Sequence, residues 1–211
     1  MSTPPPGSRS VKISDDERGG WSSDRPRRDG APPRPQSLAT RCRVLAPTDH
    51  MRYTPGSLLL VVSASAQERD RFLDRLVEEK AAALSTGRVK ALLAGRVGEA
   101  EMEAKAAEIL SGAVRRRLTA GDTVVLALDT LGAEEREPVL RLATEQKRPR
   151  HLIMLDVKTD DDDERAAQDT LRKALDAGEL GEEGVQTAMR LGGASIRELR
   201  KIVFRRAPKS E

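Results

Sequence analysis

Short aliphatic runs alternate with longer amphipathic segments along the chain from residue 57 onward. The first run, residues 58–62 (LLLVV), contains no polar residue, which is typical of a strand buried on both faces of a parallel sheet. Weaker runs of the same kind predict further strands over residues 88–93, 123–128, 151–157 and 201–205.

Between these runs, apolar residues recur at the spacing that places them on one face of a helix. This pattern predicts helices over residues 72–84, 99–118, 133–146, 165–177 and 182–191. In the longest of them the predicted inner face consists of Met102, Ala106, Ile109, Ala113 and Leu118. The alternation of strand and helix predicts an α/β fold, a three-layer sandwich in which a five-stranded parallel sheet has helices on both faces.

Residues 1–50 differ from the rest of the chain in composition. They contain most of the twelve prolines and few branched aliphatic residues. Such a segment has little apolar surface to bury against the entropy cost of an ordered backbone. We therefore expect a disordered Pro/Arg-rich tail over residues 1–50 and one folded domain over residues 51–211.

The formal net charge of +3 comes from the tail, which has nine basic and six acidic side chains. The predicted domain is neutral overall, and its aromatic residues are Tyr53, Phe72 and Phe204. It has neither the basic stripe that binds a phosphate backbone nor a platform on which bases could stack. The sequence therefore argues against nucleic acid as a partner.

Other classes of protein are excluded by simple counts. The longest uncharged apolar run, residues 57–66, is far shorter than the roughly 18 residues that a membrane-spanning helix needs, and no leader-like apolar segment is visible. Cys42 is the single cysteine, and His50 and His151 are the two histidines, so a Cys/His metal cluster is excluded. We expect a cytoplasmic protein with no membrane segment, no metal and no cofactor.

The turn after the first strand is the usual phosphate site of such a fold. A phosphate-binding loop has the pattern G-x-x-x-x-G-K-(S/T), in which backbone N–H groups and the lysine contact phosphates and the hydroxyl binds Mg²⁺. The chain has S-A-S-A-Q-E-R-D at residues 63–70. Both glycines are absent, Arg69 stands in the place of the lysine, and Asp70 stands in the place of the hydroxyl residue.

The remainder of the domain resembles the P-loop kinases of the bacterial polynucleotide-kinase and zeta-toxin type. The resemblance lies in the order strand, loop and helix, in R-L-T-A-G-D-T-V-V at residues 117–125, and in R-E-P-V-L-R-L-A at residues 136–143. It implies a P-loop NTPase fold with strand order 2-3-1-4-5 and a helical lid between the fourth and fifth strands. It also implies a degenerate cofactor site made of Ser63, Ser65, Glu68, Arg69, Asp70 and Arg136.

The departures from the family pattern concern its chemistry. The family's general base corresponds to about Ala94, and the first acid of its D-A-T-N motif corresponds to Ala127. Phosphoryl transfer depends on positioning and charge neutralisation, and the lysine, the hydroxyl and the base are all replaced. We favour a non-catalytic pseudo-kinase that acts as a binding or regulatory module for an unknown protein partner. The alternatives are an active phosphotransferase in which Arg69 replaces the lysine, and a structural subunit of an assembly.

Three sets of polar residues in the domain have a structural interpretation beside the ligand-binding one. Ser65 and Glu68 form the S-x-x-E pattern of a helix capping box. The acidic run at residues 160–164 is either a cation site or a solvated helix start, where carboxylates are favourable. Three arginines lie at the positions of the predicted lid: Arg165, Arg172 and Arg190. They either clamp phosphate, as the resemblance implies, or pair with acids on a solvent-facing helix.

Overall fold

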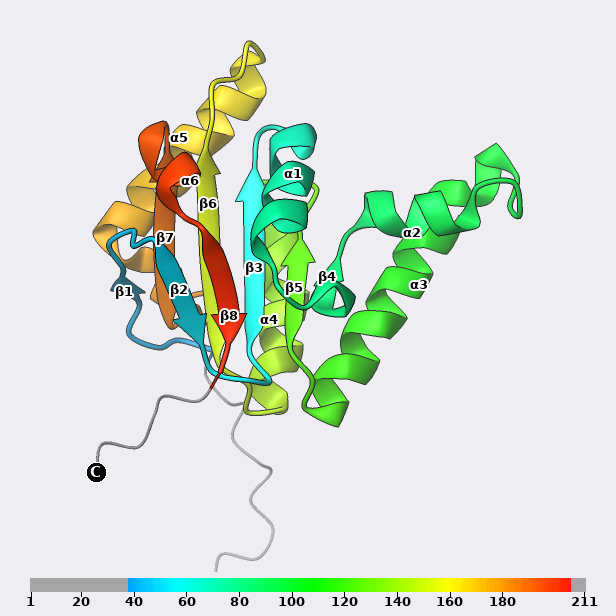
Figure 1. Cartoon of the computed structure of the whole chain (residues 1–211), viewed down its shortest axis with the longest axis horizontal. Coiled ribbons are helices and arrows are strands. Elements are labelled where there is room, and N and C mark those ends of the chain that lie inside the picture. Colours follow the sequence, from blue (N-terminus) through cyan, green and yellow to red (C-terminus); the bar gives the residue numbers. More distant parts are fainter. Residues whose placement is uncertain (1–37, 206–211) are drawn as a thin grey trace, which may run out of the picture. The chain divides into compact units, whose positions relative to one another are not determined.

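Six parallel strands form the central sheet in the computed structural model, which describes residues 38–205 (Figure 1). Their order across the sheet is β1-β7-β6-β3-β5-β4, and each neighbouring pair is parallel. The strands are β1 (Arg43–Val44), β3 (Leu58–Ser63), β4 (Ala83–Leu84), β5 (Val124–Ala127), β6 (Arg150–Asp156) and β7 (Thr187–Gly192).

Strand β3 lies at the centre, between β5 and β6, and all six of its residues are buried. Leu58 and Leu60 face one hydrophobic cluster, whereas Leu59 and Val61 face the other. This alternation is the period of an extended strand, and here both faces are covered. The prediction of a strand buried on both sides is therefore confirmed.

One face of the sheet is covered by helix α1 (Ala66–Leu76) and by a separate two-stranded parallel sheet. The small sheet consists of β2 (His50–Tyr53) and β8 (Lys201–Phe204). Met51 and Ile202 are buried against the same cluster as Phe72 of α1. The small sheet thus fills part of a layer that was expected to be helical. The short segments η1 (Lys80–Ala82) and α6 (Ala194–Glu198) complete the connections around it.

The opposite face is covered by α3 (Glu99–Ala120), α4 (Ala133–Glu145) and α5 (Asp162–Ala177). Figure 1 shows the C-terminal end of α3 beside β5. The N-terminal end of α3 leads away from the sheet, together with α2 (Thr86–Leu93). Helix α3 ends at Gly121, whose φ of 86° is the left-handed conformation that glycine adopts at little cost. The helical predictions over 99–118, 133–146 and 165–177 are confirmed.

The predicted inner face of α3 is correct only in part. Ala106 and Leu118 are completely buried, whereas Ile109 is 44% exposed. The N-terminal half of the helix packs on α2 rather than on the sheet, so its apolar residues are not all enclosed. The helix expected as a lid, α5, buries Leu171 and Leu175 in the core cluster and is thereby packed on the sheet.

The predicted strand count and strand order are corrected. Residues 88–93 lie in α2, where Ser85 caps the helix by accepting from the N–H of Arg88 at 3.2 Å. The strand of the central sheet that follows β3 along the chain is β4, which has only two residues. Most of the helix predicted over 182–191 is instead strand β7 (Thr187–Gly192), because pairing with β1 and β6 outweighs local preference. The run at 201–204 lies in the small sheet.

The structure assigns part of the expected tail to the fold. Strand β1 and the first residue of β2 lie before residue 51, and the Thr40 N–H donates to the Gly181 carbonyl at 2.7 Å. A Cβ on Gly181 would collide with this Thr40 carbonyl, so the approach requires glycine. Residues 1–37 of the expected tail lie outside the described residues. Within residues 38–205, no helix is long and apolar enough to cross a membrane.

Candidate functional site

The connection between β3 and α1, where the phosphate site is expected, is very short. The strand ends at Ser63 and the helix begins at Ala66, so Ala64 and Ser65 alone join them. Residues 66–70 of the octet, five of its eight positions, are therefore helical. A phosphate loop needs a wider backbone curve whose N–H groups converge on the ligand. The short connection leaves little backbone for such a curve.

Ser65 caps α1, as the capping-box interpretation predicts. Its Oγ accepts from the Glu68 N–H at 3.3 Å, and the Ser65 N–H donates to Ser63 Oγ at 3.1 Å. The reciprocal half of the box is not made, because the Glu68 carboxylate instead accepts from Arg71 at 2.8 Å. These bonds satisfy two of the backbone donors at the helix start, those of Ser65 and Glu68, that an anion could otherwise bind.

Arg69 is the central residue of this region, and only 4% of its surface is exposed. Its Nη1 donates to the Leu128 carbonyl, and its Nη2 donates to Asp129 Oδ1 at 2.9 Å. The Asp70 carboxylate lies on its other side, with Oδ1 4.0 Å from Nε. Arg69 therefore ties the first helix to the carboxyl end of β5 and lies between two carboxylates.

The turn after β5 is fixed by a residue that the sequence analysis did not single out. Glu135 in α4 accepts from the N–H groups of Asp129 and Thr130 at 2.9 and 2.7 Å, and from the Thr130 hydroxyl at 2.8 Å. The position of Glu135 in the first turn of a helix, five residues after Thr130, is the signal that could have identified it. Its carboxylate holds Asp129 in place for Arg69.

Arg136, the last of the predicted site residues, is 3% exposed and points to a different group. Its Nε and Nη2 make a two-pronged ion pair with Glu183 at 2.8 and 2.7 Å, and Nη1 donates to the Leu131 carbonyl. Fork-to-fork pairs of this kind are among the strongest charge-assisted contacts. Arg136 connects α4 to the segment before β7, whereas Arg69, Asp70 and the Ser65 cap are brought together at α1.

The three arginines expected at lid positions are all paired with acids. Arg172 contacts Asp156 and Asp169 at 2.9 and 2.7 Å, and these acids raise its pKa. Arg190 lies in β7, 3.8 Å from Asp176. Arg165 pairs with Asp162 at 2.5 Å on the surface of α5. Each follows the alternative of pairing with an acid.

The acidic run at 160–164 is the start of α5, where Asp161 accepts from the Glu164 N–H at 2.9 Å. It therefore follows the helix-start interpretation. Among residues 38–205, no group of three or more His, Cys, Asp or Glu side chains is placed to hold a metal ion.

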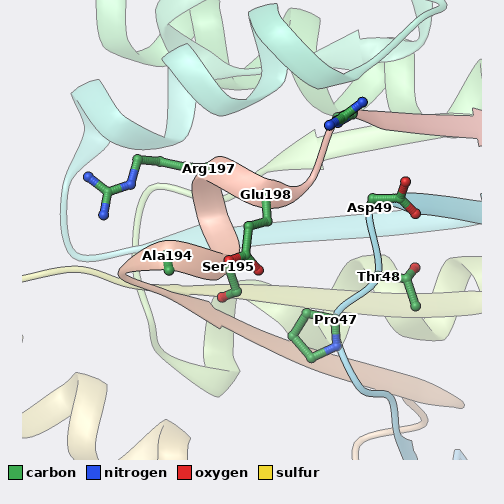
Figure 2. A pocket seen from close by; sticks show the side chains of 8 residues that line it. Pro47, Thr48, Asp49, Ala194, Ser195, Arg197 and Glu198 are labelled. Atoms are coloured by element: carbon green, nitrogen blue, oxygen red, sulfur yellow. The ribbon is translucent and has the colours of Figure 1, made fainter.

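An open cavity of about 570 Å³ lies between the segment before β2 and helix α6. Glu198 points toward the segment that carries Pro47, whereas Arg197 points away from it (Figure 2). The Ser195 hydroxyl bonds back to the Gly192 backbone at 2.9 Å. The charged groups around this cavity are of both signs, so it favours neither anions nor cations. Its lining residues are Pro47, Thr48, Asp49, Ala194, Ser195, Arg197, Glu198 and Arg200.

Cys42 and His151 are poor candidates for nucleophilic or acid–base chemistry. Burial raises the pKa of the Cys42 thiol, which makes the reactive thiolate scarcer. Burial and the neighbouring Arg150 charge lower the pKa of His151 to about 4. His151 lies near the amino end of β6, away from the sheet edge where α/β proteins bind ligands, and its Nδ1 pairs with the Thr187 hydroxyl at 2.8 Å.

No protein-family model matches the chain, and a comparison with curated proteins finds no match either. The parallel α/β fold is compatible with a P-loop kinase-like protein. The resemblance to the kinases of the polynucleotide-kinase type thus rests on the sequence motifs and on this compatibility.

Proposed function

We propose that this chain is a non-catalytic protein of P-loop kinase-like fold, a pseudo-kinase that acts as a binding or regulatory module. The position of Arg69 carries the proposal. In a working phosphate loop, the residue at this place reaches the phosphates of the nucleotide. Here the side chain is buried, Nη1 and Nη2 donate to Leu128 and Asp129, and the unbonded Nε is buried beside Asp70, so the guanidinium is held away from a phosphate by its own neighbours.

The charges around Arg69 support the same conclusion. In a working site, Mg²⁺ neutralises both the phosphates and the protein carboxylates beside them. In this chain the guanidinium of Arg69 lies 2.9 Å from Asp129 and 4.0 Å from Asp70. A metal ion placed at these carboxylates would meet a fixed positive charge. The Arg69 guanidinium thus takes the place of the Mg²⁺ ion that a bound nucleotide would bring.

An active phosphotransferase that uses Arg69 in place of the lysine is the alternative. It requires the guanidinium to leave Asp129 and turn toward the ligand. Breaking a buried ion pair costs about 3–5 kcal/mol, and the half-exposed Asp129 places this pair at the low end of that range. The nucleotide would have to supply this energy before any catalysis. The geometry therefore supports the alternative less well.

Isothermal titration with Mg-ATP and with Mg-GTP tests the proposal. The full chain is expected to give no binding, and its melting temperature is expected to stay unchanged. A ligand at 100 times its dissociation constant would stabilise the native state by about 2.7 kcal/mol, which a melting curve readily detects.

Micromolar binding by the wild type would overturn the proposal. In that case Arg69→Met, with the exposed neighbour Arg71→Met as its control, would show whether Arg69 has taken over the role of the lysine. A chain that carries Ser63→Gly, Glu68→Gly, Arg69→Lys and Asp70→Ser serves as the rebuilt comparison. Binding by the rebuilt chain alone would support both the P-loop origin of the fold and the loss of its nucleotide site.

A further inference from the structure

A second cavity, of about 300 Å³, lies between α3 and α4 at the carboxyl end of β5. Its floor is formed by Leu126 and Leu128, which belong to the hydrophobic core. Helix α3 diverges from the sheet toward its N-terminal end (Figure 1). The residues of α3 that line the cavity recur at helical spacing, so they form one face of the helix. The apolar wall residues are Ala107, Leu110, Val114, Pro138, Val139 and Leu142.

The polar groups at the rim of this cavity differ in what remains available for a ligand. Three of them are carboxylates, and each already has partners: Glu103 pairs with Lys90, Asp129 with Arg69, and Glu135 with the turn after β5. Arg115 is the remaining charged residue of the lining. It is exposed, and within residues 38–205 it has neither a hydrogen bond nor an ion pair.

We propose that the α3–α4 cavity binds a small organic anion, with an aliphatic or aromatic body on Leu126 and Leu128 and an acidic group on Arg115. Ligand sites are typically concave, mostly apolar and equipped with a few polar groups that fix orientation, and this cavity has each of these features. A guanidinium offers a planar pair of donors that fits a carboxylate or sulfonate. This inference goes beyond the proposed function, because it involves neither a nucleotide nor the β3–α1 connection.

The volume favours a small molecule over a docked helix. One turn of α-helix, about 5.4 Å long and about 10 Å across, fills about 420 Å³. The cavity, at about 300 Å³, is smaller than that single turn. A medium-length fatty acid or an aromatic acid fits within this volume and leaves its charged end at the rim.

Fluorescence titration of the full chain with anilinonaphthalene sulfonate, an aromatic anion, provides the first test. We expect saturable binding that is displaced by decanoate and not by decylamine, which has the same chain length and the opposite charge. Displacement by both compounds alike, or no saturable binding, would overturn the proposal.

Variants then locate the site. Arg115→Gln is expected to weaken binding of the probe about tenfold, the size of one charge-assisted hydrogen bond. Arg116→Gln removes the same charge from the next residue of α3, which does not line the cavity, and is expected to change nothing. Ala107→Trp, at an exposed position on the wall, is expected to abolish binding and to leave the melting temperature unchanged. Equal effects of Arg115→Gln and Arg116→Gln, or full binding by Ala107→Trp, would contradict the assignment.

Discussion

The β3–α1 connection and the α3–α4 cavity lie at the carboxyl ends of two neighbouring strands, yet they are built in opposite ways. At the connection, Ser65 caps the helix and Arg69 is enclosed between Asp70 and Asp129. At the cavity, apolar walls surround an open space and Arg115 keeps its charge available within the described part of the chain. The difference teaches that a familiar position in the fold does not ensure that a ligand site is open.

The two regions share a common support, and disrupting it is expected to have the largest effect. Leu60 is completely buried in β3, and it lies opposite Leu126, which forms part of the cavity floor. Leu60→Ala is expected to lower the free energy of unfolding by about 2–5 kcal/mol, the range for a truncated core leucine. Chemical denaturation measures this change. A loss below about 1 kcal/mol would mean that β3 is not the central strand.

Removing the two arginines separates the closed region from the open one. Arg69→Met removes a buried charge together with its bonds to Leu128 and Asp129, and should lower the free energy of unfolding by about 2–3 kcal/mol. Arg115→Met, on the exposed surface of α3, should change it by less than about 0.5 kcal/mol. The two values come from denaturant unfolding under identical conditions. Equal losses in both variants would erase the distinction between the regions.

A pair of serine variants makes the same distinction at a smaller scale. Ser65→Ala removes the cap of α1 and is expected to cost about 1 kcal/mol. Ser111→Ala changes an exposed residue in the middle of α3, where alanine is the better helix former, so the expected effect is neutral or slightly stabilising. Thermal melts of both variants give the comparison. A neutral Ser65→Ala would show that the cap contributes nothing to holding the connection closed.

The sequence predicts those parts of the fold in which local pattern and tertiary role agree. The residues of β3 are all aliphatic up to Ser63, and α3, α4 and α5 have clear amphipathic spacing. It fails for β4, which is too short to show a period, and for β7, whose sequence T-A-M-R-L-G has no run of aliphatic residues. The position of β7 depends on its pairing with β6, which a local window does not contain.

For the residues of the candidate site, the sequence predicts local contacts but not long-range partners. The octet at residues 63–70 shows which groups of a phosphate loop are missing, and the Ser65 cap follows from its pattern. The partner of Arg69 does not follow, because Asp129 lies 60 residues further along the chain. The pairing of Arg136 with Glu183 spans 47 residues and is equally invisible to local reasoning. Long-range ion pairs decide whether these arginines are available, and they appear only in the folded structure.

The most direct test of the central claim, that the β3–α1 connection is closed to nucleotides, is a backbone amide NMR titration of the full chain with Mg-ATP. The amides of Ser65, Glu68 and Arg69 report on the place where phosphates would bind. The account predicts that these three resonances do not move at millimolar Mg-ATP. Saturable shifts centred on these amides would contradict it, because they would require the Ser65 cap and the Arg69–Asp129 pair to open for the ligand.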